Sequence, residues 1–338
     1  MILSLMSSDK QKVAYLVVCW NNRKIIDECL QSLQQQTYKN TVVYVIDNDS
    51  SDGSAEYIEQ NYPSVLLTKH DQNSGFSRGN NLLIHEALKD KDVGYVALIN
   101  SDAVLDKDWT KNLIDFLKDK SHFAGAQGLT LDYYDHDIVD AEYIYVEPNF
   151  QSVQYGYGKS LNETEHKEAR RVFGVNAAAA IFSRHFIEDQ PENVLFDEKY
   201  YMYLEDMDVA LRSVITGWEN YFVPSARAYH MGSVSSKKRS NGYNIKMTFR
   251  NQAALLYKHL PYRVFKNYLL AAIKFERHFY IHLIKTHGYK TLWMAVTGRI
   301  VGILRLPLYT RDRKRLMKKR TISSEELERI IKNRGEFS

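Results

Sequence analysis

The alternation of strand-like and helix-like segments over the first hundred residues constrains this chain more than any other feature. Apolar runs of strand length alternate with segments that repeat apolar side chains at helical spacing: strands at 13–19, 41–46, 64–68 and 94–99, helices at 23–35, 55–61 and 76–88. This alternation predicts an α/β fold with a mixed, mainly parallel sheet and right-handed crossovers. Ligands of such sheets bind beyond the carboxyl ends of the strands.

Two acidic turns follow predicted strands at that edge. Residues 47–52 read Asp-Asn-Asp-Ser-Ser-Asp, which suits hydrogen bonds from a nucleoside or simply stabilises the turn. Asn100-Ser101-Asp102 offers oxygen ligands for a hard divalent cation, Mg²⁺ or Mn²⁺, or caps its own turn. His230 ends a predicted strand at 227–230 and is a further candidate ligand for that cation.

A cluster of carboxylates lies at the start of a later helical pattern. Glu205, Asp206 and Asp208 stand in an aromatic segment, and the helical pattern ends at Gly217. Acidic residues in a first helical turn interact with free N–H groups, which is one interpretation. The apolar flanks favour another: a partly desolvated carboxylate with a raised pKa, suited to act as a general base.

Several nucleotide and catalytic motifs are missing. The first strand is followed by Trp20-Asn21-Asn22-Arg23 and not by Gly-x-Gly-x-x-Gly, which argues against a dinucleotide-binding dehydrogenase or a methyltransferase. A Walker A sequence and a Gly-x-Ser-x-Gly elbow are also missing. A nucleotide would therefore be held through carboxylates and a metal.

The order of the motifs resembles the GT-A fold glycosyltransferases of family 2, close to the bacterial rhamnosyltransferase-like branch. The resemblance covers about residues 13–255 and rests on five segments in the family's order: 45–54, 73–81, 98–102, 196–212 and 230–235. It implies a Rossmann-like nucleotide-diphospho-sugar fold with helices on both faces of the sheet.

The resemblance implies roles for individual residues around a nucleoside diphosphate sugar, either dTDP- or UDP-linked. The donor-site residues are Asp47 on the base or ribose, Asp49 or Asp52 in support of the turn, Asn73, Arg78 and Asn80 in the donor loop, and Asn100 and Ser101. Asp102 and His230 would hold Mg²⁺ or Mn²⁺. Asn100 departs from the family's first aspartate in this motif and removes one negative charge from the metal site.

The resemblance also implies the catalytic arrangement. Asp206 matches the general base, Glu205 and Asp208 would shape the acceptor pocket, and Arg212 would pair with one of them. One carboxylate within reach of an acceptor hydroxyl suffices for direct displacement, which inverts the anomeric centre. We therefore expect an inverting transferase.

The chain divides into an acidic front and a basic back. Residues 237–320 hold 21 Lys and Arg but two acidic residues, a net of about +19, and residues 1–236 are about −14. We expect a catalytic domain at 1–242 and an aromatic-rich basic helical region at 243–338, with a last short helix at 323–333. The region suits an anionic membrane surface; a solvated helical domain or a homo-oligomer interface is the alternative, and no known motif indicates nucleic acid.

Location follows from what the sequence contains. Cys19 and Cys29 read as reduced core thiols, residues 1–12 are too polar for a signal peptide, and no run of eighteen apolar residues exists. We expect a cytoplasmic protein that is peripheral at the inner face of the cell membrane.

The leading expectation is transfer of rhamnose from dTDP-rhamnose to a lipid-linked cell-surface polysaccharide precursor. A UDP-hexose donor is the second. A non-catalytic, membrane-bound subunit that binds sugar or nucleotide is the alternative from another class.

Overall fold

The structure is a computed structural model that describes residues 11–149, 151–164, 166–232 and 241–337. Its centre is a ten-stranded sheet in the order β10-β12-β6-β11-β4-β1-β2-β3, with β5 beside β12 and β7 beside β6. The strands are β1 (Lys12–Cys19), β2 (Thr41–Asn48), β3 (Leu66–His70), β4 (Val93–Ile99), β5 (Ala103–Leu105), β6 (Phe123–Asp132), β7 (Val139–Ala141), β10 (Arg170–Val172), β11 (Ala179–Ser183) and β12 (Glu219–His230). A separate hairpin pairs β8 (Ile144–Val146) with β9 (Ser152–Gln154).

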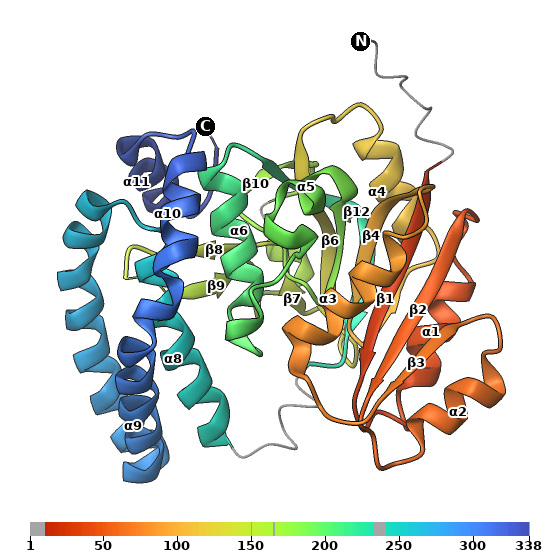
Figure 1. Cartoon of the computed structure of the whole chain (residues 1–338), viewed down its shortest axis with the longest axis horizontal. Helices are drawn as coiled ribbons and strands as arrows, with labels where there is room; N and C mark the ends of the chain where they lie inside the picture. Colours follow the sequence, from red (N-terminus) through yellow and green to blue (C-terminus); the bar gives the residue numbers. More distant parts are fainter. Residues whose placement is uncertain (1–10, 150, 165, 233–240, 338) are drawn as a thin grey trace.

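Helices cover both faces of this sheet (Figure 1). They are α1 (Ile26–Gln34), α2 (Ser54–Asn61), α3 (Gly75–Ala87), α4 (Trp109–Leu117), α5 (Arg184–Asp189), α6 (Glu205–Ile215), α8 (Asn241–His259), α9 (Tyr262–Leu304), α10 (Thr310–Lys319) and α11 (Ser324–Lys332). One hydrophobic cluster joins α1, α2 and α4 to the sheet, and another joins α3 and α5 to the opposite face. The α/β class expected from the alternation is confirmed.

The first half of the sheet is parallel. Strands β3, β2, β1 and β4 lie side by side in one direction, so their carboxyl ends meet at one edge. Buried aliphatic side chains on both faces of β1 stabilise this arrangement, as a doubly covered strand requires. The two acidic turns therefore lie at the same edge of the sheet, as expected.

The second half is mixed and departs from the sequence-based expectation in two ways. Residues 103–139, for which we had no expectation, contain β5, α4 and β6. The short strand expected at 227–230 is the end of a longer strand, β12, whose register with β6 shifts between Val223 and Arg227. Pro224 lies in that shift; proline cannot donate a ladder hydrogen bond and is therefore found at such irregularities.

The C-terminal helices pack on the part of the molecule that contains the sheet, at the left of Figure 1. Ala254 and Leu255 of α8 and Ile330 of α11 belong to the same hydrophobic cluster as Met207 and Leu211 of α6. The expected division at residue 242 stays a prediction about folding units, but residues on its two sides share one core. The expected last helix at 323–333 is α11.

The described residues contain no single helix that is long and apolar enough to span a membrane. Gly288–Leu304 and Leu306–Lys319, bent by 52°, pass the same criterion of length and composition as a pair. Both cysteines are free and buried, as core thiols would be.

Candidate functional site

Three turns meet at the edge where β1, β2 and β4 end. Asn22, in the turn after β1, joins them: its Nδ2 donates to Ser101 Oγ and its backbone N–H donates to Ser54 Oγ at 3.2 Å. Ser101 therefore positions a neighbouring turn. Asn22 was not among the predicted site residues, although its place directly after the first strand was a signal available from the sequence.

Asp47 is the most buried aspartate of the acidic turn, and it lies at the end of β2. Its side chain is 4% exposed, and Oδ2 accepts a hydrogen bond from the Ser50 N–H at 3.0 Å. Among the described residues, Oδ1 is buried without a hydrogen-bond partner, and the same holds for Oδ1 of Asn22. Buried polar atoms are normally paired, so these two oxygens are candidate acceptors for donor groups of a ligand or of water.

The other two aspartates of the turn differ in role. Asp52 accepts from the Arg23 N–H at 3.0 Å and from the Ser54 N–H at 3.2 Å, so it holds the turn in shape. Asp49 is exposed, with φ at 67°, a conformation that Asp tolerates better than most residues. Of the two, Asp52 has the turn-supporting contacts.

The predicted donor loop leads into α3. Asn73 Oδ1 accepts from the Gly75 N–H at 3.0 Å, and Asn48 Oδ1 accepts from the Ser74 N–H at 2.9 Å. Asn80 is buried and donates to the Phe76 carbonyl of its own helix, whereas Arg78 is exposed. Asn73 therefore shapes the loop, and the Arg78 side chain faces solvent, where an anionic ligand could reach it.

The candidate cation ligands come together across the sheet. Antiparallel pairing of β12 with β5 sets His230 opposite Ala103, and His230 Nε2 lies 3.3 Å from Asp102 Oδ1. Asn100 Nδ2 lies 3.4 Å from the same Nε2. Asp140 of β7, which we did not predict, lies with Oδ2 3.1 Å from His230 Nδ1 and so orients the ring.

This arrangement fits a cation that arrives with a diphosphate. The described residues contain no group of three or more His, Cys, Asp or Glu that could hold a metal ion. Mg²⁺ bound with nucleotides often uses one or two carboxylates and completes its shell with phosphate oxygens and water, and Mn²⁺ prefers the same oxygen ligands. Asp102, with His230 beside it, matches that pattern.

The His230 imidazole is held between two carboxylates. Its burial opposes protonation, but hydrogen bonds to Asp102 and Asp140 outweigh the burial and raise its pKa to about 10. The ring is therefore protonated at neutral pH and forms an ion pair with Asp102. A metal ion at this position would take the place of that proton.

The segment that leads into α6 is strained. Tyr201, Tyr203 and Leu204 all have positive φ, at 65°, 69° and 69°. For residues that carry a Cβ, each such conformation costs on the order of 1–3 kcal/mol and persists where surrounding contacts enforce it. The strained segment brings Glu205 and Asp206 to the first turn of α6, as the sequence predicted.

The two carboxylates have different ionisation. Burial raises the pKa of Glu205 to about 8, and the neighbouring charge of Asp206 adds to the effect. Burial raises the pKa of Asp206 to about 6, although the hydrogen bond from the Met207 N–H opposes it. At neutral pH Asp206 is therefore mostly ionised with a pKa suited to a base, whereas Glu205 is mostly protonated.

Asp208 and Arg212 lie in a buried ionic network. Asp208 is inaccessible to solvent; Arg212 Nε donates to its Oδ2 at 2.8 Å, and Lys258 Nζ of α8 donates to its Oδ1 at 2.7 Å. The expected pairing of Arg212 with a carboxylate is present. The geometry does not support the expectation that Asp208 shapes the acceptor pocket, because its oxygens are occupied by partners within the protein.

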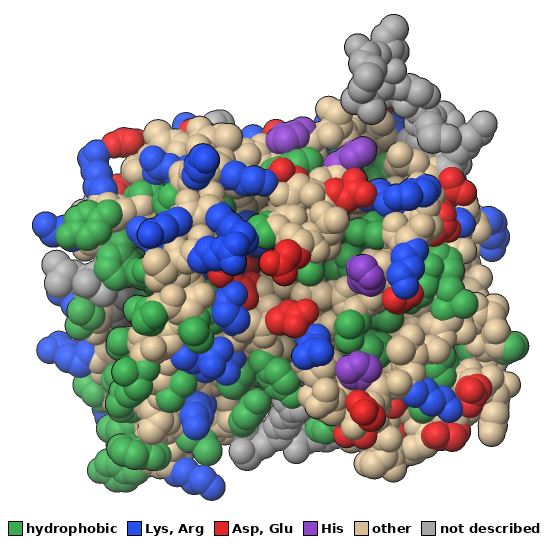
Figure 2. Space-filling view, viewed as in Figure 1, with side chains coloured by type: hydrophobic (Ala, Val, Ile, Leu, Met, Phe, Trp, Pro, Cys, Tyr) green, Lys and Arg blue, Asp and Glu red, His purple; other side chains and the backbone are tan. Residues whose placement is uncertain are grey.

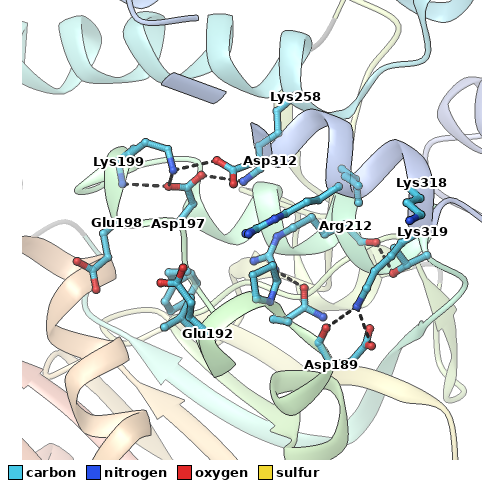
Figure 3. A pocket seen from close by; sticks show the side chains of 17 residues that line it. Asp189, Glu192, Asp197, Glu198, Lys199, Arg212, Lys258, Asp312, Lys318 and Lys319 are labelled. Carbon is cyan, nitrogen blue, oxygen red and sulfur yellow. Dashed lines mark hydrogen bonds and ion pairs between the residues drawn. The ribbon is translucent and has the colours of Figure 1, made fainter. Parts of the chain in front are cut away.

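A cavity of about 890 Å³ opens beside the C-terminal half of α6 (Figure 3). Arg212 lines it, but none of the predicted donor or metal residues does. Lysines bridge several of its carboxylates: Lys199 contacts Asp197 at 2.8 Å and Lys319 contacts Asp189 at 2.9 Å. This cavity is therefore separate from the edge where the turns meet.

The sequence matches a known family and relatives. Residues 15–175 match the model of glycosyl transferase family 2. N-acetylglucosaminyl-diphospho-decaprenol L-rhamnosyltransferase of Mycobacterium tuberculosis is 26% identical over 228 residues, which cover 61% of this chain and 71% of the relative.

Solved structures share the fold. GalNAc-T7, with UDP, GalNAc and Mn²⁺, superposes with a TM-score of 0.57 at 14% identity, over 73% of this chain and about half (48%) of that chain. S. aureus TarS (residues 1–349) superposes with a TM-score of 0.54 at 15% identity, over 96% of this chain and 90% of that one. Together with the sheet-edge geometry, these matches show a GT-A fold and a likeness to glycosyl transferase family 2 over residues 15–175.

Proposed function

We propose that this protein is an inverting glycosyltransferase that moves a sugar from a nucleoside diphosphate to a hydroxyl of a lipid-linked glycan. The observation that carries the proposal is the convergence at one edge of the sheet. Asp47 presents a buried, unpartnered oxygen there among the described residues, and Asp102 and His230 lie 3.3 Å apart at the same edge. The Tyr201 carbonyl accepts from the Phe76 N–H of α3 at 3.0 Å, which connects the strained segment before Asp206 to the donor loop.

The residues divide the chemistry between them. Asp47 Oδ1 accepts a hydrogen bond from an N–H group of the nucleobase. Asn73 and Arg78 lie beside the diphosphate. Asp102 and His230 would hold a divalent cation, whose chemistry is to neutralise charge that develops on the leaving diphosphate. Asp206 takes the proton from the acceptor hydroxyl, and attack from the face opposite the leaving group inverts the anomeric centre. Glu205, protonated at neutral pH, adds no second negative charge beside the base.

The first donor we propose is dTDP-rhamnose. The M. tuberculosis relative is named as a rhamnosyltransferase that uses a diphospho-decaprenol acceptor, and it matches over most of its length. A UDP-hexose is the second candidate, because GalNAc-T7 was solved with UDP and shares the fold. Asp47 would accept a hydrogen bond from uracil and thymine alike, so it does not separate the two.

We propose further that α9 and α10 rest on the cytoplasmic surface of an anionic membrane, where a lipid-linked acceptor would be found. Trp293, Ile300 and Leu304 follow helical spacing on α9 and are 69%, 51% and 73% exposed. Figure 2 shows apolar and basic side chains interleaved over the part of the molecule where Figure 1 places α9. Exposed apolar side chains flanked by Lys and Arg are typical of helices that lie in the membrane interface.

A transfer assay tests the proposed function. The purified protein, Mn²⁺ and a polyprenyl diphosphate that carries one N-acetylglucosamine are incubated with dTDP-rhamnose or with UDP-hexoses. We expect a product one sugar larger by mass spectrometry, with the anomeric configuration opposite to that of the donor by NMR. Retained configuration would contradict the mechanism. If the protein catalyses neither transfer nor donor hydrolysis with any of the donors, the result would favour the non-catalytic binding subunit.

A further inference from the structure

The strained segment before the candidate base is held from the C-terminal region. Asn251 of α8 is 1% exposed, and its Nδ2 lies 3.1, 2.9 and 2.8 Å from the backbone carbonyls of Tyr200, Met202 and Tyr203. An amide group has two N–H donors, so three carbonyls share them and one hydrogen bond is bifurcated. One side chain therefore fixes three of the carbonyls that would otherwise reorient if the segment relaxed.

Arg250 fixes the orientation of that amide. Its Nε donates to Asn251 Oδ1 at 2.9 Å, which leaves Nδ2 to face the carbonyls, and its Nη2 donates to the Tyr200 carbonyl at 2.6 Å. Because Oδ1 accepts from a guanidinium that cannot itself accept, the two ends of the amide are distinguishable by their partners. A flipped amide would place its NH₂ against the guanidinium and remove the Asn251 donor from the carbonyls of Met202 and Tyr203.

The donor side of the site holds the same segment. The Tyr201 carbonyl accepts from the backbone N–H groups of Phe76 and Ser77 at 3.0 and 3.2 Å, in the first turn of α3. The residues from Tyr200 to Leu204 are thus held between α3, which follows the donor loop, and α8, which belongs to the basic C-terminal region. Glu205 and Asp206 follow directly after the segment.

We propose that Asn251 is a positioning residue for the transfer reaction: by holding the carbonyls of Tyr200, Met202 and Tyr203 it sets the direction of the Asp206 carboxylate toward the acceptor hydroxyl. The inference rests on the proposed function of Asp206. It gives the C-terminal helices a part in catalysis that is independent of membrane contact, and α8 is fixed in place for that part because it shares a hydrophobic cluster with α6.

The test compares Asn251→Ala with Asn220→Ala, a matched loss of a buried asparagine. Asn220 of β12 donates to the Phe173 carbonyl and to Ser213 Oγ, at the far end of α6 from Asp206. We expect Asn251→Ala to lower kcat at least tenfold while the dissociation constant for UDP or dTDP changes less than twofold. The acidic limb of its pH–kcat profile should move to lower pH, because a relaxed segment admits water to the Asp206 carboxylate.

Hydrogen exchange reports on the same contact without turnover. Amides of residues 201–207 should exchange at least tenfold faster in Asn251→Ala and at the wild-type rate in Asn220→Ala. Arg250→Ala leaves Asn251 in place and should show a smaller increase in the exchange rate of the same amides. This variant replaces Asn251→Ala in the test if Asn251→Ala does not fold. Equal kcat in the two asparagine variants, or unchanged exchange at 201–207, would overturn the positioning role. A wild-type protein without any transfer would instead overturn the proposed function, and the positioning role with it.

Discussion

At the scale of single residues, the proposed role of Asp206 as general base gives the most specific prediction. Asp206→Asn keeps the size of the side chain and removes the proposed general base. We expect kcat to fall by about 10²–10⁴-fold, the usual contribution of a general base, while nucleotide binding is retained. Initial rates and titration calorimetry with UDP or dTDP check the two halves of this expectation. Near-normal turnover in the variant would mean that another group takes the proton.

Glu205 provides a second test at the residue scale, through pH. Its pKa of about 8 in the folded protein exceeds the usual value for Glu of about 4.3, so between these values the folded state binds more protons than the unfolded state. This group's contribution to stability is therefore lost as pH rises from about 4 to about 8. Glu205→Gln stays neutral throughout.

Glu205→Gln should accordingly be more stable than the wild type at pH 8.5, by up to about 5 kcal/mol, and close to it at pH 4.5. Urea unfolding at both pH values measures the difference. A gain of equal size at the two pH values would show that Glu205 does not carry the raised pKa.

At the scale of elements, the start of α3 and the strained segment before α6 are in close steric contact. Gly75 has φ at +81°, and a Cβ there would lie 2.6 Å from the Tyr201 ring and 2.8 Å from the Tyr201 carbonyl oxygen. Neither α3 nor the segment can move without breaking the hydrogen bonds between them. Only glycine therefore fits at this position, for two independent reasons: the positive φ and the lack of space for a Cβ.

Gly75→Ala should lower the free energy of unfolding by more than Gly158→Ala does, and it should also lower transfer. Gly158 has φ at +75° but open space around it, so its variant reports the cost of the conformation alone, about 1 kcal/mol. Chemical denaturation of both variants separates the clash from the strain. Equal losses in the two variants would contradict a close contact at Tyr201.

How far the sequence predicts these elements depends on whether local pattern or distant pairing decides them. The parallel strands and the turns that carry Asp47 and Asp102 were predictable, because buried strands and polar turns have local signatures. Strand β6 was not, because it contains Gly125, Ala126 and Gly128, which are poor strand formers, and depends on β11 and β12 for its hydrogen bonds. Asp140 and Asn251 were missed because their partners are distant in the chain.

At the scale of the whole molecule, the uneven distribution of charge along the chain gives the C-terminal helices a surface that differs in charge from the rest of the protein. The apolar and basic face of α9 (Figure 2) contrasts with the sequence of residues 1–236, whose net charge is about −14. Deleting residues 261–338 would be a poor test of membrane contact, because Leu316, Leu327 and Ile331 belong to a hydrophobic cluster shared with α6. Exchanging exposed side chains leaves that core intact.

Trp293→Ser together with Leu304→Ser should weaken binding to vesicles that contain anionic lipid, by at least tenfold, since both side chains are largely exposed and would insert into the interface. Tyr134→Ser is the matched control, an equally exposed apolar side chain outside the C-terminal helices. Co-sedimentation with vesicles measures the effect. Equal weakening by the control, or unchanged binding in the double variant, would remove α9 from the membrane contact.

The measurement that tests the central claim most directly is the stability of the protein with UDP, dTDP, GDP and CDP, each with and without Mn²⁺. If Asp47, Asp102 and His230 form one nucleotide site, UDP or dTDP at about 100 times its dissociation constant should add about 2.7 kcal/mol in the presence of Mn²⁺. Asp47→Ala and Asp102→Ala should each lose most of that gain. Stabilisation that is the same for all four nucleotides, or that persists in both variants, would contradict a donor site at this edge of the sheet.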